Sequence, residues 1–236
     1  MQVRRPSMTS PVLIIIPAYN EEATILQTVQ TIETNTPYDY IVINDGSTDL
    51  TLNILKAHQK PHISLPVNLG IGGAMQTGYK YAHRQGYEYA MQLDADGQHD
   101  PADISLLLES IQDGDYDMVI GSRFLEKTAY KGSIIRRIGI SYFYYLLKMI
   151  AKIDVYDPTS GYRIVNKRVI TLFAQDYPVD YPEVEVLVTL SRKKYRIKEV
   201  KTEMNDRQGG ASSITNVKGL YYMIKVTFFS LIRSFL

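Results

Sequence analysis

The sequence predicts an α/β protein whose central sheet is mostly parallel and flanked by helices. Strand and helix signals alternate along the first half of the chain. The strand candidates are short runs of β-branched and aliphatic residues, as in strands that are buried on both faces. Each run ends in a polar or glycine-containing loop, and open α/β sheets bind ligands beyond the carboxyl ends of their strands. These observations predict a doubly wound sheet with right-handed crossovers and functional loops along one edge.

The first half of the chain gives the order of these elements. Val12–Ile16 is a strand candidate that ends at Pro17, and Asn20, followed by two acidic residues, predicts the capped start of a helix that reaches about Thr34. Further strands are expected at 40–44, 63–65, 90–93 and 118–120. The helices between them are expected to end near residues 58 and 84 and to span 103–112. This order is that of repeated strand–helix–strand units.

The second half of the chain is less regular. It predicts a Tyr-rich helix, a loop, two helices, a strand and a polar loop, at about 133–153, 154–162, 167–174, 182–193, 197–200 and 204–213. An amphipathic helix is predicted at the end of the chain, Ile214–Leu236, because Lys218, Lys225 and Arg233 would share one face of it. We therefore expect one domain at 1–213 and a C-terminal amphipathic helix at 214–236, which contacts a membrane or another subunit.

The composition excludes several classes of protein. The 236 residues carry 26 Lys+Arg against 25 Asp+Glu, so the basic excess of a nucleic-acid binder is missing. The lack of Cys excludes disulfides and zinc–thiolate sites and fits a reducing compartment. The basic N-terminus precedes only a short apolar run, so we expect no signal peptide, and no run reaches the roughly 18–20 apolar residues of a spanning helix. The 19 Tyr residues favour boundaries between apolar and wet surroundings.

The sharpest chemical feature is a pair of carboxylates at the end of the fourth predicted strand. Asp94 and Asp96 are two residues apart, and Gly97 permits a tight turn after them. Two carboxylates this close repel each other unless a cation lies near them, and a hard divalent ion is a common solution. A calcium loop counted from Asp94 fails, because its sixth residue is His99 and its twelfth is Ser105. A surface turn before a helix is the alternative interpretation.

Two further loops follow predicted strands. Taken by itself, Asn44–Asp49 is a glycine turn followed by a helix cap. Because it lies at a strand end, a second interpretation is that Asp45 accepts hydrogen bonds from a nucleobase and that Tyr19 flanks this base. The loop at Gly70 lacks the third glycine of a dinucleotide fingerprint, where Met75 stands instead. We interpret the Gly70 loop as a close approach of backbone to a sugar or a phosphate.

Several arginines are suited to phosphate. Arg123 follows the fifth predicted strand, at the same sheet edge as the carboxylates, and arginine can clamp phosphate oxygens. Arg137 and Ser141 lie near the start of the Tyr-rich helix, and Arg207 lies in a loop with two glycines. A solvated surface position is the ordinary alternative for each arginine.

Taken together and in order, these motifs resemble the family 2 glycosyltransferases of the GT-A (Rossmann-like) fold. The similar branch contains dolichol-phosphate mannose synthase and bacterial polyprenyl-phosphate sugar synthases. The resemblance runs from about Val12 to Ser213 and is carried by Ile16–Glu22, Asn44–Asp49, Asn68–Gly70, Asp94–Gln98, Gly121–Arg123 and Thr159–Arg163. It implies an inverting hexosyltransferase that uses a nucleotide-diphosphate sugar, with UDP preferred over GDP, and Mg²⁺ or Mn²⁺.

The resemblance also implies roles for single residues. The nucleotide-sugar would be held by Pro17, Tyr19, Glu21, Asp45, Gly70, Asp94, Asp96 and Arg207. The metal would be held by Asp96, with Gln98 and Asp94 beside it, and the acceptor phosphate by Arg123, Arg137 and Ser141. A bound cation would stabilise the charge that develops on the departing nucleoside diphosphate, and Arg207 would close over that diphosphate.

The nature of the acceptor decides whether a general base is needed. A polyprenyl phosphate, the acceptor that we expect, is already anionic at neutral pH, whereas a sugar hydroxyl needs a carboxylate within hydrogen-bond reach. Asp157, Glu183 and Glu185 are the candidates for such a base. The alternative for the two glutamates is compensation of a helix dipole, and Asp157 could equally form a turn before Pro158.

Other functions stay open at this point. The second hypothesis is a glycosyltransferase that acts on a sugar hydroxyl of a lipid-linked or cell-wall glycan. A third, less favoured hypothesis is a non-catalytic nucleotide-binding module. A processive polymerase is excluded because the chain lacks the Trp of its signature. We expect a cytoplasmic protein, peripheral on the inner face of the cell membrane, with the helices at 133–153 and 214–236 on anionic lipid. A packed helix or a homo-oligomer contact is the alternative for these helices.

Overall fold

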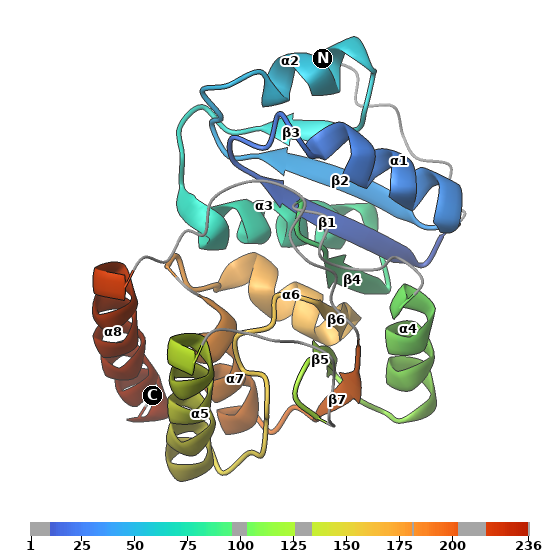
Figure 1. Ribbon diagram of the computed structural model, residues 1–236. Helices are drawn as coiled ribbons and strands as arrows, with labels where there is room; N and C mark the ends of the chain where they lie inside the picture. The colour runs from blue at the N-terminus through green and yellow to red at the C-terminus, as the bar shows by residue number, and fades with distance from the viewer. Residues whose placement is uncertain (1–9, 96–102, 126–133, 181, 203–215, 236) are drawn as a thin grey trace.

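The fold is an open α/β sheet with helices on both faces (Figure 1). The computed structural model describes residues 10–95, 103–125, 134–180, 182–202 and 216–235. Within these ranges the strands are β1 Val12–Ala18, β2 Asp39–Asn44, β3 His62–Ser64, β4 Tyr89–Gln92, β5 Met118–Ser122, β6 Arg163–Asn166 and β7 Ile197–Lys201. The helices are α1 Ile25–Asn35, α2 Thr51–Ala57, α3 Gly70–Gln85, α4 Asp103–Asp113, α5 Ile134–Ile150, α6 Lys167–Gln175, α7 Pro182–Arg192 and α8 Asn216–Phe235.

The sheet is mostly parallel, as the sequence predicts. The strand order is β3-β2-β1-β4-β6-β5-β7, and the pairs β1–β2, β1–β4, β2–β3 and β5–β7 are parallel. The strand β6 is antiparallel to both of its neighbours. Its first residue, Arg163, pairs with Gln92 near the end of β4. The loop before β6 therefore lies at the carboxyl edge of β4, beside Asp94.

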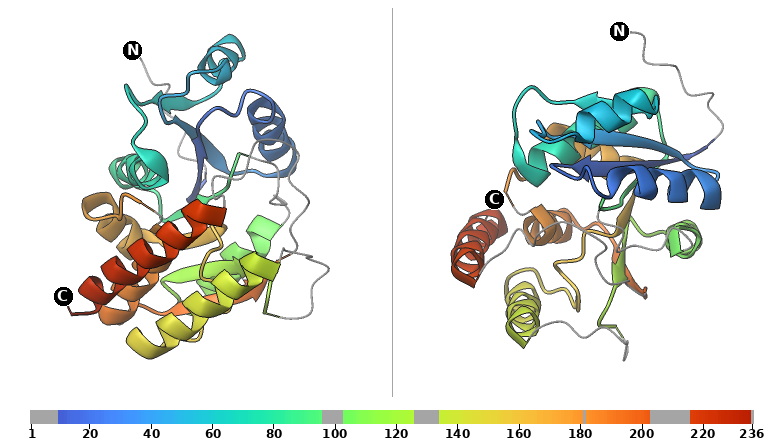
Figure 2. Two further views of the ribbon diagram at one scale, coloured as in Figure 1. Left: turned by 60° about the vertical axis from the view of Figure 1, so that its left-hand side comes forward. Right: turned by 45° about the horizontal axis from the view of Figure 1, so that its top comes forward.

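Two apolar cores cover the two faces of the sheet. One contains Ile25 and Val29 of α1 together with Ile104 and Leu107 of α4. The other gathers α3, α5, α6 and α7, with Val226 of α8 at its border. Figure 2 shows α5, α7 and α8 as a group of helices at one end of the molecule, away from α1 and α2. The site can therefore lie between these groups, along the edge where the strands end.

The start of the first helix differs from the prediction. Asn20 does not cap it, because its backbone has a left-handed φ of 57° and its amide oxygen accepts the Thr48 N–H at 2.8 Å. The helix α1 begins at Ile25 instead. The short segment before it hydrogen-bonds to the loop after β2.

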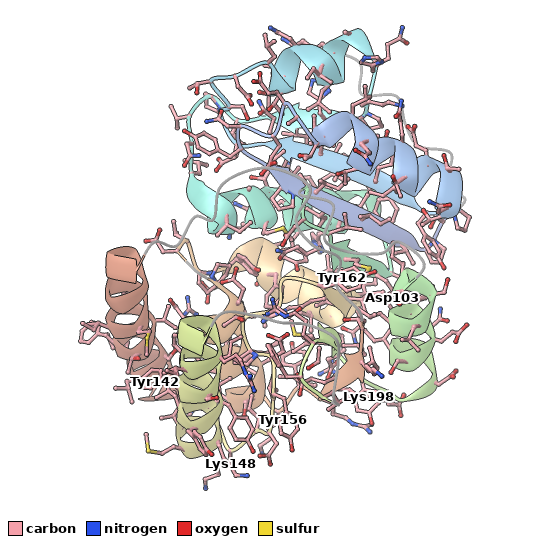
Figure 3. The ribbon with its side chains drawn as sticks, viewed as in Figure 1. Asp103, Tyr142, Lys148, Tyr156, Tyr162 and Lys198 are labelled. Carbon is pink, nitrogen blue, oxygen red and sulfur yellow. The ribbon has the colours of Figure 1, made fainter. Side chains whose placement is uncertain are left out.

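The C-terminal helix packs on the protein. Arg233 of α8 forms ion pairs with Glu185 on α7 and Asp176, both at 3.2 Å, and Lys225 pairs with Asp180. Tyr142 of α5 hydrogen-bonds Thr227 of α8 at 2.8 Å, and Figure 3 shows Tyr142 on the side of α5 near α8. None of the helices in the described ranges has both the length and the apolar character needed to cross a bilayer.

Candidate active site

The loops after β1 and β2 are joined into one unit. The strands end level with each other, since Ala18 pairs with Asn44. The Glu21 N–H donates to Thr51 Oγ1 at 2.8 Å, and the Glu22 carboxylate accepts the Leu50 N–H at 2.9 Å. The predicted nucleotide residues of the first loop are placed on this unit, with Pro17 at the end of β1, Tyr19 exposed and Glu21 half-buried.

Asp45 connects this unit to the third loop. Its side chain is buried, and Oδ1 accepts the Leu69 N–H at 2.7 Å. The neighbouring Gly46 has a φ of +65°, and a Cβ there would lie 2.6 Å from the Val67 backbone, so a larger residue does not fit. Three loops of the strand edge thus meet at Asp45, which explains the strand-end position of this acidic residue.

The glycine-rich loop makes the close backbone approach that the sequence predicts, and the described partner is another segment of this chain. The Gly72 N–H donates to the Val179 carbonyl at 3.1 Å, and a Cβ on Gly72 would lie 2.1 Å from the Pro178 carbonyl oxygen. Gly70 has a φ of +77° and starts α3. The role of Gly70 toward a sugar or a phosphate stays a prediction.

Asp94 is oriented by Gln92. The Gln92 side-chain amide is buried and donates to Asp94 Oδ1 at 3.0 Å. From the other side, Gly161 packs so closely that a Cβ there would lie 2.6 Å from Gln92 Nε2 and 3.3 Å from Asp94 Oδ2. Asp94 is therefore held in a fixed orientation between β4 and the loop before β6.

The predicted metal site is described only at Asp94. Asp96 and Gln98 lie outside the described residues, as does Arg207. Among the residues that are described, no three His, Cys, Asp or Glu side chains gather as metal ligands. Carboxylate and amide oxygens are donors suited to Mg²⁺ and Mn²⁺, so the set Asp94, Asp96 and Gln98 fits such an ion by its chemistry.

Arg123 and Asp157 form a buried ion pair. The distances are 2.6 Å from Nε to Oδ2 and 2.7 Å from Nη2 to Oδ1, and the two side chains are 3% and 0% exposed. The resemblance implies that Arg123 binds an acceptor phosphate, and Asp157 was one of the candidate general bases for a hydroxyl acceptor, with a turn before Pro158 as its alternative. In this arrangement each group is occupied by the other, because a bidentate pair uses both carboxylate oxygens. The geometry therefore favours a structural role for both over the predicted ones.

Two charged residues of this region, the buried Arg163 and the half-buried Glu199, were not assigned a role from the sequence. Glu199 of β7 accepts the N–H groups of Tyr156 and Asp157 at 2.7 and 2.8 Å. Burial raises the pKa of Glu199, while these hydrogen bonds act in the opposite direction. Arg163 of β6 donates to three backbone carbonyls. The only sequence signal for Arg163 is its place in the Thr159–Arg163 motif, and Glu199 has none.

The two candidate glutamates of α7 lie in different surroundings. Glu185 is buried and bound to Arg233 of α8, which gives it a structural partner. Glu183 is half-buried in the first turn of α7. Burial raises the pKa of Glu183; the positive charge of Arg163 lowers it, and the negative charge of Asp94 raises it. Glu183 is therefore the glutamate whose charge is coupled to the strand-edge site.

The two remaining predicted residues lie on α5. Arg137 and Ser141 are one helical turn apart and exposed, so they share a face of α5. The structure thus places one predicted group at the ends of β1, β2 and β4, and a second on a helix of the other half of the molecule (Figure 1).

A solved structure shares the fold of this chain. The chain resembles glucosyl-3-phosphoglycerate synthase from Mycobacterium tuberculosis, solved with Mn²⁺, UDP and phosphoglyceric acid, with a TM-score of 0.73. The sequence identity is 20%, and the likeness covers 94% of this chain and 78% of that chain. The fold is thus the GT-A fold that the ordered motifs predict.

The family follows from the sequence match. Residues 13–173 match the model of glycosyl transferase family 2, so the chain belongs to this family and is a glycosyltransferase. One relative is the UDP-N-acetylglucosamine–dolichyl-phosphate N-acetylglucosaminyltransferase of Methanococcus voltae, 29% identical, with 80% of this chain and 83% of that protein covered. Another is the polyprenol monophosphomannose synthase of Mycolicibacterium smegmatis, 28% identical, with 92% and 86% covered. The family expected from the motifs is confirmed.

Proposed function

We propose that this glycosyltransferase moves a sugar from a nucleotide-diphosphate sugar to a polyprenyl phosphate, with inversion at the anomeric carbon. The observation that carries the proposal is the match, over most of the chain, to relatives named for transfer to dolichyl phosphate and polyprenol phosphate. A UDP-sugar is the preferred donor, in keeping with the UDP donor named for the Methanococcus voltae relative and the UDP bound in the M. tuberculosis structure.

The donor would lie along the ends of β1, β2 and β4. Tyr19 is exposed beside the joined first and second loops, where it can flank a base. The carboxylate of Asp45 has a second oxygen besides the one that accepts the Leu69 N–H, so it can accept a hydrogen bond from the nucleoside. Asp94, oriented by Gln92, would lie at the ribose and diphosphate.

A divalent ion, Mg²⁺ or Mn²⁺, would be held by Asp94, Asp96 and Gln98. When bound, it neutralises charge on the departing nucleoside diphosphate. Asp94 contributes a carboxylate whose direction Gln92 fixes before the ion arrives, so little ordering is needed on binding. Arg207 would add a positive charge over the same diphosphate.

The acceptor phosphate needs binding and orientation more than activation, because it is anionic at neutral pH. Arg137 and Ser141 on the exposed face of α5 supply a cation and a hydroxyl one turn apart. Arg123 is a weaker candidate for this role, since it would have to release Asp157 to bind a phosphate.

The lipid tail of such an acceptor would lie in a membrane surface beside α5 and α8. We define the apolar α5–α8 face by its exposed side chains: Ile138, Tyr142, Tyr145, Met149, Ile224, Phe228, Leu231 and Ile232. The helices run side by side and in the same direction (Figures 1 and 2). The Tyr142–Thr227 hydrogen bond brings the two stripes together. We therefore place the protein on the cytoplasmic face of the cell membrane, with this face in the interface.

A transfer assay tests the function. UDP- and GDP-sugars are offered with undecaprenyl phosphate and Mn²⁺ or Mg²⁺, and the lipid product is treated with mild acid. We expect transfer from a UDP-sugar, loss of transfer on chelation or in Asp96→Ala, and an acid-labile sugar phosphate. Full activity of Asp96→Ala would contradict the metal role, and absence of any lipid product would contradict the acceptor.

Glu183 favours one alternative, transfer to a sugar hydroxyl of a lipid-linked or cell-wall glycan. It is a half-buried carboxyl near Asp94, and burial raises its pKa toward the range of a general base. A product whose glycosidic bond survives mild acid, together with loss of activity in Glu183→Gln, would support this alternative over the lipid phosphate.

A further inference from the structure

Arg163 is a buried arginine with an unusual set of partners. It is 4% exposed, and each of its three guanidinium nitrogens donates to a backbone carbonyl oxygen: Nε to Ser160 at 2.6 Å, Nη2 to Pro158 at 2.8 Å, and Nη1 to Glu183 at 2.7 Å. Arg123 is buried to the same degree, but its guanidinium is paired with the Asp157 carboxylate. Arg163 therefore serves to hold backbone segments in place.

These carbonyls belong to two separate segments, one packed against Asp94 and one whose first turn carries Glu183. Pro158 and Ser160 lie in the loop that ends at Gly161, whose Cα is packed against Gln92 and Asp94. Glu183 lies 20 residues after Arg163, in the first turn of α7. One planar guanidinium thus joins the loop beside Asp94 to the start of the helix that carries Glu183.

The charge of Arg163 has a second effect on the same groups. Asp94 and Glu183 are both acidic, and the negative charge of Asp94 acts on Glu183. The guanidinium lies between the loop and the helix and opposes this repulsion. Arg163 therefore influences the spacing of Asp94 and Glu183 in two ways, through its hydrogen bonds to the two segments and through its positive charge.

We propose that Arg163 is a positioning residue for sugar transfer: it fixes the loop at 158–161 and the start of α7 at the spacing that the reacting groups need. This inference rests on the proposed function for its kinetic effect. Lysine cannot replace it, because a single ammonium nitrogen cannot reach three carbonyls that are spread along the guanidinium fork.

The test compares Arg163→Lys with Arg168→Lys, which changes a 70% exposed arginine five residues further on. We expect Arg163→Lys to fold and to bind UDP with Mn²⁺ with a Kd, measured by calorimetry, within about threefold of that of the unchanged protein. Its kcat is expected to fall about 10- to 100-fold. Arg168→Lys is expected to match the unchanged protein in UDP affinity and in kcat.

Amide hydrogen exchange without any acceptor gives an independent readout. In Arg163→Lys we expect faster exchange at 157–161 and 182–186 together, and unchanged exchange in β2. An unchanged kcat, unchanged exchange at either segment, or a parallel loss of UDP affinity and thermal stability would overturn the positioning role. If the unchanged protein transfers no sugar to a polyprenyl phosphate, the proposed function fails, and the exchange result alone decides the role of Arg163.

Discussion

Asp157 is the residue on which the loop before β6 depends most. Its carboxylate binds the Arg123 side chain twice and also accepts the Arg123 backbone N–H at 3.1 Å. Its own N–H is bound by Glu199. Both oxygens of this completely buried carboxylate therefore accept hydrogen bonds from Arg123.

Replacing Asp157 is therefore expected to destabilise the fold strongly. Asp157→Asn leaves the buried Arg123 guanidinium without its counter-charge, which costs about 3–5 kcal/mol in buried pairs. The measurement is urea unfolding. Asp154→Asn is the matched control, since Asp154 pairs with Lys148 at 2.7 Å in the open and both side chains are more than half exposed. Equal losses in the two variants would contradict the structural role of the buried pair.

Glu183 is expected to reduce stability at high pH. Burial raises its pKa in the folded protein, so the folded state holds the proton more tightly than the unfolded chain does. Its contribution to stability is present below the unfolded pKa and is lost as the pH rises through the folded pKa. Arg163 and Asp94 modify this shift in opposite directions.

Glu183→Gln should therefore raise the unfolding midpoint at pH 8 and change it little at pH 4. We expect a rise of about 2–4 °C, which corresponds to roughly 1 kcal/mol in a chain of this size. Thermal unfolding followed by circular dichroism measures the midpoint, and Glu109→Gln, which changes an exposed residue of α4, is the control. A lower midpoint at pH 8 would show that the charged form is stabilised in the fold.

At the scale of elements, the strands were easier to predict than the starts of helices. The apolar runs of β1, β2, β4 and β5 mark buried strands, and their loops place Asp45 and Asp94 at one edge. The strand β6 was missed because it has four residues and continues directly into α6, with Asn166 as N-cap and no turn between them. The expected cap at Asn20 was wrong because long-range bonds to the Asn44–Asp49 loop compete with local capping.

The contact between α3 and the 178–179 segment is another feature that local sequence patterns do not show. Gly72 is required there by backbone atoms that are distant in sequence. Gly72→Ala is expected to lower the free energy of unfolding by about 1–3 kcal/mol, as overpacking does. A Cβ added at Gly139 on α5 has no neighbour within 4 Å, so Gly139→Ala should raise the free energy of unfolding by about 0.5–1 kcal/mol through helix propensity. Urea unfolding of both variants checks the opposite signs.

At the scale of the whole molecule, the first half of the chain was easier to predict than the second. The ordered motifs were sufficient for the fold and the family. The partners of Arg123, Asp157, Arg163 and Glu199 were not predictable, because each pair joins segments that meet only through the antiparallel insertion of β6. The sequence predicted a Tyr-rich helix and an amphipathic C-terminal helix, and the structure shows that the two helices are in contact and that each carries exposed apolar side chains.

The apolar α5–α8 face leads to a prediction about membrane binding. The basic side chains expected to face lipid are partly used inside the protein, since Lys225 and Arg233 of α8 pair with acidic residues of the 176–185 segment. Binding would therefore depend mainly on the apolar side chains. Burial of a large apolar side chain contributes about 1.5–3 kcal/mol, so removing two of them should reduce binding at least about tenfold.

Flotation with vesicles that contain anionic lipid tests this directly. The double variant Ile224→Ser, Phe228→Ser changes two exposed residues of α8, while Leu106→Ser changes an exposed residue of α4 on the opposite face of the sheet. We expect the double variant to stay with the soluble fraction and Leu106→Ser to float like the unchanged protein. High salt should weaken binding only modestly, because the apolar contribution is not screened. Equal flotation of all three proteins would exclude the apolar α5–α8 face as the lipid-binding surface, and a self-association lost in the double variant would assign it to a subunit contact instead.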